Sequence, residues 1–405
     1  MTLRRQRRAI AAVFAVHGAV MGTFAARIPS MAEHLHLGAG TLGLALFMPA
    51  VGSMAIMPFT GRVIHRLGPR AALQVLLGAY CVLLAVPPLM PSLALLCVSL
   101  VAYGAAAGTA DVAMNAQGSA LEHRMGTSIM SSLHGMWSIG GFVAAAIATV
   151  ATRFDVGAPA HLAVMALVLL LGGQAAVRML PALGAGDAAE PVERPRFKFP
   201  VGIILVIALV GFCAVFGEVA GSDWSAVYMH TVMHSGAATA AATYGVFAGL
   251  MAVGRLTGDR VVRRFGAATT VRVGALVGAI GAVLVVLALA TPLTIIGFAL
   301  LGIGVATVVP LAFAAAGRIG AQSGSAAAGN AIAGVATIAY GAGLAAPGVI
   351  GGIASLTSLT WSFVFVAGLV AIIVFAGRAL GPRTAGEPDE RATVPEVAVV
   401  DVWPV

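Results

Sequence analysis

Three acidic residues stand in or just beside long apolar stretches of this chain, where charge is costly. They are Asp111, Glu218 and Asp223, and they are three of 15 Asp and Glu residues. A carboxylate in such a place can hold a proton or form an ion pair, and it is by default a candidate for function. These residues are therefore candidates for proton binding or for gating.

Asp111 and Asn115 lie four residues apart, so they share one face of a helix. Gly104 and Gly108 continue this face and would allow another helix to approach closely. His134 opens a later apolar stretch at a similar depth, and histidine titrates near neutral pH. An Asp111–His134 pair would serve as a proton site or an inner gate. The alternative is a structural ion pair that fixes two helices.

Glu218 and Asp223 lie toward the end of one apolar run, in the stretch GFCAVFGEVAGSDWSAVYM. Arg27 ends the first apolar run of the chain. We expect Arg27 to meet Glu218 or Asp223 and to form an outer gate with it. The alternative is that Arg27 and Asp223 lie in the hydrated headgroup zone of a membrane.

The composition indicates where these residues must sit. Hydrophobic residues make up 60% of the 405 residues and charged residues only 9%, against about 25% charged residues in soluble domains. So few charges cannot cover the surface of a soluble protein of this length. The composition therefore predicts an all-α integral membrane protein, and the net charge of +8 does not argue for nucleic acid as a partner.

About 20 apolar residues cross the hydrocarbon core as a helix, and continuous runs exclude alternating strands. The first run follows a basic start and resembles a signal peptide, but its length favours a membrane span. Twelve spans are predicted at 9–27, 39–60, 71–90, 92–116, 130–152, 160–180, 200–221, 238–258, 270–290, 293–316, 326–350 and 357–379.

The basic residues predict the orientation of the chain. With twelve spans both termini lie on one side, and 21 of the 23 Lys and Arg residues fall on that side. Arg27 and Arg153 are the two exceptions. Because basic loops stay in the cytoplasm, we expect both termini to be cytoplasmic in a bacterial inner membrane.

A basic phrase occurs twice, as GRVIHRLG from Gly61 and as DRVVRRFG from Asp259. The offset of 198 residues also relates His36 to His234, Gly104 to Gly302 and Thr109 to Thr307. Since this offset is half the chain, the sequence predicts two parallel six-helix halves. The expected parts are a first half at 1–180, a cytoplasmic linker at 181–200, a second half at 201–380 and a disordered tail at 381–405.

This organisation resembles the major facilitator superfamily, whose loop motif is approximately G-x-x-x-D-R-x-G-R. The first copy matches this motif at Gly61, Arg66 and Gly68 and carries Arg70 one position after the motif's final Arg, but His65 stands where the family has Asp, and Arg263 stands there in the second copy. The stretches AMNAQGSALEHR, MSSLHGMWSIGG and GSDWSAVYM resemble a bacterial, fucose-permease-like branch of the family.

The resemblance implies a central cavity lined by spans one, four, seven and ten, with spans five, eight and eleven beside them. Each polar residue in these spans is otherwise a packed residue of the core. The candidate substrate or coupling residues are His17, Asp111, Asn115, His134, Trp137, Glu218, Thr307, Asn330 and Tyr340. The candidate gate residues are Arg27, Asp223, Gly61, His65, Arg66, Gly68, Arg70, Asp259, Arg260, Arg264 and Gly266.

The expected function is secondary active transport of a small sugar-like or other polar metabolite by alternating access. No P-loop or Cys pair is present, so we expect no cofactor, no metal and no enzyme. Proton coupling is the hypothesis, and membrane lipid, the solute and the proton are the expected partners of a monomer. The alternatives are a drug or metabolite exporter, a membrane sensor that binds a solute without moving it, and a polytopic enzyme that uses Asp111 with His134.

Overall fold

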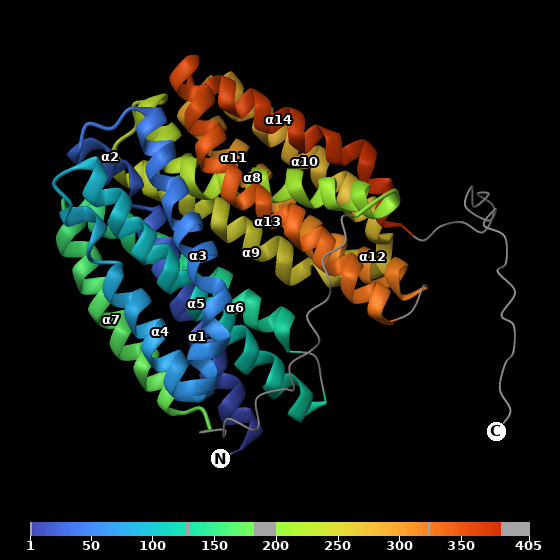
Figure 1. The fold of residues 1–405 in the computed structure, drawn as a ribbon. Helices are drawn as coiled ribbons and strands as arrows, with labels where there is room; N and C mark the ends of the chain where they lie inside the picture. The colour runs from blue at the N-terminus through green and yellow to red at the C-terminus, as the bar shows by residue number, and fades with distance from the viewer. Residues whose placement is uncertain (1, 127–128, 182–199, 323–324, 382–405) are drawn as a thin grey trace, which may run out of the picture.

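The computed structural model describes residues 2–126, 129–181, 200–322 and 325–381, and all regular elements in these ranges are helices (Figure 1). The predicted linker at 181–200 and tail at 381–405 fall outside the described residues, except for residues 181, 200 and 381.

The first half contains α1 Leu3–Ala25, α2 Ile28–His34, α3 Ala39–Leu67, α4 Pro69–Leu83, η1 Pro87–Leu89, α5 Leu93–Met125, α6 Met130–Arg153 and α7 Ala158–Arg178. The second half contains α8 Ile203–Thr231, α9 Ala237–Phe265, α10 Ala267–Leu287, α11 Thr291–Val305, α12 Val308–Ala321, α13 Ser325–Leu356, α14 Leu359–Ala376 and η2 Gly377–Leu380. Twelve helical segments are long and apolar enough to cross a membrane. The predicted all-α fold with twelve spans in two six-helix halves is confirmed.

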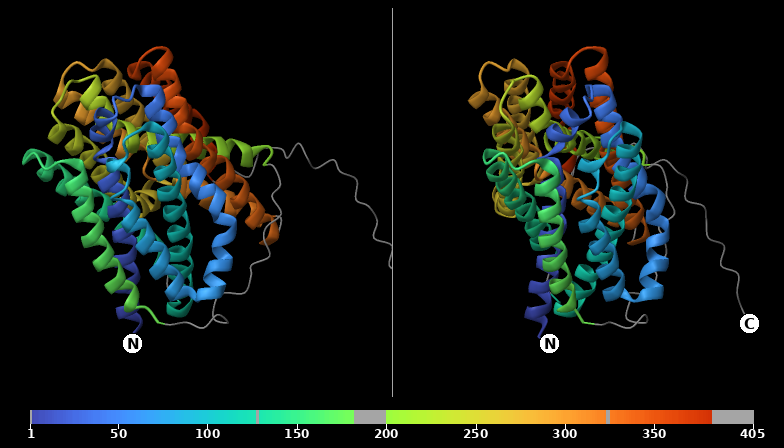
Figure 2. Two further views of the ribbon diagram at one scale, coloured as in Figure 1. Left: turned by 60° about the vertical axis from the view of Figure 1, so that its left-hand side comes forward. Right: turned by 90° about the vertical axis from the view of Figure 1, so that its left-hand side faces the viewer.

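The two halves meet at one end of the molecule and diverge toward the other (Figures 1 and 2). We call the end with the N-terminus and the turn at Gly68 the near end, and the end with α2 the far end. The halves converge at the far end, where a Cβ placed on Gly43 of α3 would lie 2.7 Å from the Cα of Gly351 of α13. This conformation is therefore closed at the far end.

The internal repeat is visible in the backbone. Helices α3 and α9 each have 29 residues and begin 198 positions apart. The loops before them hold His36 at φ 50° and His234 at φ 48°. These two equivalent positions are non-glycine residues in the left-handed region of the backbone. The turns after the two helices hold Gly68 at φ 77° and Gly266 at φ 78°. The same local geometry thus recurs in both halves.

The resemblance to the family's loop motif predicts a loop at the duplicated basic phrase, but both copies are helical in the structure. Residues 61–67 form the last two turns of α3, and residues 259–265 form the last two turns of α9. Each helix ends at a glycine with positive φ, which strains other residues, and the next helix begins directly after it. The connection between these spans is a single residue, shorter than predicted.

The span predicted at 293–316 is interrupted, because α11 changes to α12 at Ala306 and Thr307. The change from α1 to α2 at Ala26 and Arg27 falls at the end of the span predicted at 9–27. Hydropathy alone does not reveal these breaks, because the apolar run continues through each of them.

Equivalent glycines bring equivalent helices together in the two halves. A Cβ on Gly104 of α5 would overlap the carbonyl oxygen of Pro49 in α3. A Cβ on Gly302 of α11 would lie 2.6 Å from the carbonyl oxygen of Phe247 in α9. Both residues of the second contact are 198 positions after those of the first, so one packing arrangement is used twice.

This packing predicts a difference between two glycine-to-alanine variants. Gly104→Ala should lower the stability of the protein by roughly 1–3 kcal/mol, because the added methyl group forces α3 and α5 apart. Gly172→Ala in α7 should be neutral or slightly stabilising, because nothing lies within 4 Å of the added Cβ and alanine favours a helix. Thermal unfolding of the two variants in detergent measures this difference, and equal melting temperatures would contradict it.

Candidate functional site

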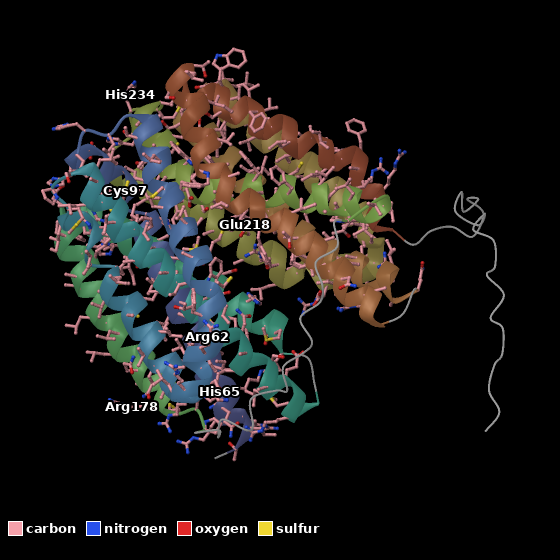
Figure 3. All side chains as sticks on the ribbon, in the orientation of Figure 1. Arg62, His65, Cys97, Arg178, Glu218 and His234 are labelled. Atoms are coloured by element: carbon pink, nitrogen blue, oxygen red, sulfur yellow. The ribbon has the colours of Figure 1, made fainter. Side chains whose placement is uncertain are left out.

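A charged pair lies inside the second half, on the helices α8 and α9. One terminal nitrogen of Arg255 lies 2.7 Å and 2.8 Å from the two carboxylate oxygens of Glu218. The two side chains are 21% and 23% exposed, and Glu218 lies near the middle of the molecule between its ends (Figure 3). Glu218 is therefore neutralised by Arg255, which was not among the candidates from the sequence.

Asp111 of α5 faces the same central region from the first half. Among the described residues, no hydrogen bond or ion pair ends on its carboxylate; the side-chain amide of Asn115 bonds instead to the Asp111 backbone carbonyl at 2.9 Å. Asp111 interacts electrostatically with His17 and His134. Asp111 is thus a half-buried carboxylate without a neutralising contact.

The expected Asp111–His134 ion pair is not formed in this conformation. His134 is exposed, and its ring packs edge-on against Phe14 at a centroid distance of 5.3 Å. His134 also interacts electrostatically with Arg255 of the other half. The two residues therefore belong to one region, but they contribute to it separately.

Tyr340 of α13 completes this region from the second half. Its side chain is 62% exposed and packs edge-on against Phe313 at 6.0 Å. Tyr340 interacts electrostatically with Asp111, Glu218 and Arg255. We call Asp111, His134, Glu218, Arg255 and Tyr340 the central polar cluster. Both halves contribute to it.

His17 of α1 is buried and fully engaged. The indole nitrogen of Trp137 donates to its Nδ1 at 3.0 Å, and its Nε2 lies 3.2 Å from the carbonyl oxygen of Ala107. Since Nδ1 accepts and a carbonyl only accepts, the neutral tautomer with hydrogen on Nε2 satisfies both contacts. His17 and Trp137 therefore join α1, α5 and α6 rather than point to a ligand in this conformation.

Two buried tyrosines, Tyr80 and Tyr103, connect the surroundings of His17 with Asp223 of the second half. The hydroxyl groups of Tyr80 and Tyr103 lie 3.1 Å apart, and the ring of Tyr80 lies 4.7 Å from that of His17. Asp223 accepts a hydrogen bond from the Ser222 hydroxyl at 3.0 Å and interacts electrostatically with Tyr103. Asp223 thus lies among residues of both halves, not in an exposed loop.

Arg27 does not meet Glu218 or Asp223, contrary to expectation. It is 2% exposed, and it donates to Nδ1 of His161 at 3.1 Å and to the carbonyl oxygen of Val156 at 2.9 Å. The break between α1 and α2 turns Arg27 toward the connection between α6 and α7. Glu218 is in any case held by Arg255.

Among the described residues, the remaining candidates make no hydrogen bond or ion pair with the central polar cluster. Thr307 sits at the break between α11 and α12, and Asn330 is half-buried in α13. Arg70 donates to the carbonyl oxygen of Arg178 at 2.6 Å, a favourable place for a cation at the end of a helix. Gly68 is half-buried, and the other gate candidates of the duplicated phrase are exposed; these are Gly61, His65, Arg66, Asp259, Arg260, Arg264 and Gly266. Figure 3 places His65 near the N-terminal end and His234 at the opposite end.

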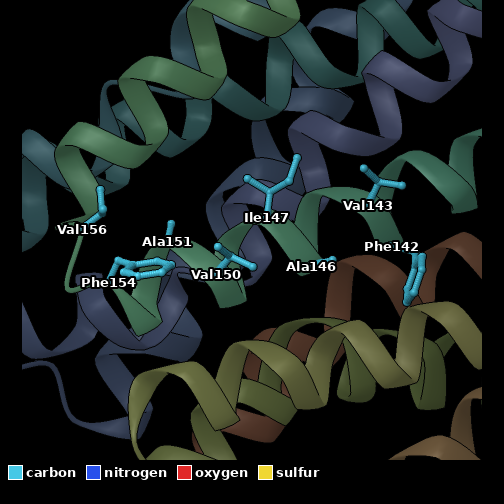
Figure 4. Close-up of a pocket in the computed structure, with 8 residues that line it drawn as sticks. All are labelled: Phe142, Val143, Ala146, Ile147, Val150, Ala151, Phe154 and Val156. Atoms are coloured by element: carbon cyan, nitrogen blue, oxygen red, sulfur yellow. The ribbon is translucent and has the colours of Figure 1, made fainter.

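A separate apolar groove of about 540 Å³ runs along the C-terminal half of α6 and the residues that follow it (Figure 4). Its lining residues are Phe142, Val143, Ala146, Ile147, Val150, Ala151, Phe154 and Val156. The groove offers no charged or hydrogen-bonding side chain, so it cannot select a polar solute. The central polar cluster remains the candidate site.

Comparison with known proteins gives a consistent result. The sequence profile of the Major Facilitator Superfamily matches residues 10–341. An uncharacterized transporter of Sinorhizobium fredii is 34% identical over 375 residues, covering 91% of this chain and 96% of its own length. An uncharacterized MFS-type transporter of Yersinia pestis is also 34% identical, covering 91% and 94%. The membrane protein MosC of Rhizobium meliloti is 28% identical, covering 94% and 91%.

Solved structures show the same fold at low sequence identity. The nucleoside transporter NupG superposes with a TM-score of 0.71 at 11% identity, over 94% of this chain and 99% of that one. The human organic anion transporter MFSD10 superposes with a TM-score of 0.63 at 18% identity, over 92% and 99%. These similarities describe the fold and not the solute.

The Glu218–Arg255 pair predicts a non-additive effect on stability. Glu218→Gln and Arg255→Gln should each destabilise the protein, because each leaves a charge without its partner. The double variant should be more stable than the sum of the single effects predicts, with an interaction energy of about 1–3 kcal/mol. Unfolding of the four proteins in detergent measures this energy, and strictly additive effects would show that the pair contributes nothing.

Proposed function

The chain belongs to the Major Facilitator Superfamily, and from that premise we propose that it moves a small polar organic solute by secondary active transport. The observation that carries the proposal is the central polar cluster, which combines Asp111 and His134 of one half with Glu218, Arg255 and Tyr340 of the other. A cluster shared between two halves changes its geometry when the halves rock against each other, as alternating access requires.

We propose that the conformation described above is one end state of this cycle. The halves are packed together at the far end and diverge toward the near end, so the cluster would exchange with the near side. The distribution of basic residues supports a cytoplasmic near side, with both termini there, in a bacterial inner membrane. The motif stretches noted in the sequence support the fucose-permease-like branch.

Proton coupling is proposed at Asp111. Glu218 already has a cationic partner at 2.7 Å, so a proton on Glu218 would leave Arg255 unpaired. Asp111 has no such contact, and a proton would remove its uncompensated charge, which is costly inside a membrane. Tyr340 and His134 then supply an aromatic face and hydrogen bonds for a sugar-like or other polar metabolite.

The unit of transport in this proposal is one chain, because a single copy supplies both sides of the cluster. Membrane lipid and the solute are the other partners, and no step needs a nucleic acid or an enzymatic reaction. The parts proposed for the cycle are the two halves at 1–180 and 201–380, with 181–200 joining them.

The proposal is tested in two stages. A thermal-shift screen of the purified protein against sugars, organic acids and drugs first identifies a solute that binds. In proteoliposomes, the wild type should then exchange this solute by counterflow and accumulate it when a pH gradient is imposed. Asp111→Asn should keep counterflow within about twofold while losing gradient-driven accumulation, because its carboxamide cannot take up the proton.

The matched control is Asp155→Asn, in the exposed connection between α6 and α7. Asp155 has a φ of 55°, and asparagine tolerates this left-handed conformation, so the control should behave as the wild type. Accumulation that persists in Asp111→Asn would place the coupling elsewhere. Binding without counterflow in the wild type would favour a sensor, and solute extrusion driven by the gradient would favour an exporter.

A further inference from the structure

An ion pair joins the two halves at the far end of the molecule. Nε2 of His230 in α8 lies 2.6 Å from Oε1 of Glu33 in α2. The side chain of His230 is 27% exposed and that of Glu33 is 58% exposed, so the pair lies at the edge of the closed surface. Neither residue stood among the candidates from the sequence.

The second nitrogen of His230 decides the protonation of this pair. Its Nδ1 lies 3.3 Å from the carbonyl oxygen of Ser235, and a carbonyl oxygen only accepts, so Nδ1 carries a hydrogen. The contact between Nε2 and Glu33 then needs a second hydrogen, on the imidazole or on the carboxyl group. The joined pair holds one proton more than a neutral histidine and a separate carboxylate.

We propose that Glu33 and His230 form a proton-dependent latch, a site that takes up one proton when the far end closes. The proposal deepens the proposed transport function and rests on it, because it names a proton site facing the far side. Opening the far end separates α2 from α8 and splits the pair, and the proton can then leave to that side.

The neighbouring charged groups do not replace this contact. His34 follows Glu33 in α2, and His234 lies in the exposed connection from α8 to α9. Arg27 precedes α2, but it is turned toward His161 and Val156. The other ion pair among the described residues, Glu218–Arg255, lies within the second half. Glu33 is thus the carboxylate that His230 contacts across the interface.

Linkage gives the direction of the pH dependence. The closed state, in which the pair is joined, binds one more proton than an open state in which the histidine is neutral. Raising the pH therefore favours the open far end, because the open state binds fewer protons.

The test measures the conformational equilibrium of the full chain in lipid nanodiscs, with pH as the probe and no solute added. Cys81, Cys97 and Cys213 are replaced by alanine. Spin labels at Phe154→Cys and Leu356→Cys report the far end; these residues are 75% and 87% exposed, one in each half. A second pair at Leu67→Cys and Phe265→Cys reports the near end. Double electron–electron resonance then gives the distance populations at pH 6, 7 and 8.

The long-distance population at the far end should rise relative to the short one as the pH is raised from 6 to 8, while the near-end distances shorten. His230→Asn and Glu33→Gln should each remove this pH dependence. His234→Asn is the matched control, because asparagine tolerates the φ of 48° at this position, and it should keep the wild-type response.

Far-end populations that stay constant in the wild type from pH 6 to pH 8 would overturn the latch without any variant. The same holds if His230→Asn keeps the wild-type pH response. Because this measurement needs no solute, its failure differs from a failure of the transport proposal, which would appear as absent counterflow in proteoliposomes.

Discussion

A charge inside an apolar bundle must be neutralised or put to use, and the polar interior of this protein depends on that constraint. Arg255 neutralises Glu218 within one half, and Trp137 and Ala107 hold His17 neutral within the other. Asp111 alone in the central polar cluster is a carboxylate without such a contact. The place proposed for a mobile proton therefore follows from which residues already have a neutralising or hydrogen-bonding partner.

In the proposed transport cycle, the two halves would move against each other as units. Contacts within each half are close and repeated, as at Gly104 with Pro49 and Gly302 with Phe247. The ion pair between the two halves, Glu33 with His230, lies at the far end. Rigid halves joined by a contact that depends on a proton can exchange two conformations without repacking either core.

The sequence predicts the number of spans and the repeat well, because hydropathy and a fixed offset need no knowledge of packing. It does not predict the rotation of a helix about its axis. For this reason Arg255 was not among the candidates although it faces Glu218, and Arg27 was paired with carboxylates although it faces His161. The helical turns at residues 61–67 were missed because basic residues there look like a loop.

The single-residue connections at Gly68 and Gly266 have a mechanical consequence. One residue offers no slack, so the two helices on either side of it cannot slide independently along their axes. Helices α3 and α4, like α9 and α10, would act as stiff levers that carry displacement from the membrane centre to the surface. The basic side chains on the last turns of α3 and α9 would then travel farthest, and the charged surface of the near end would be rearranged in every cycle.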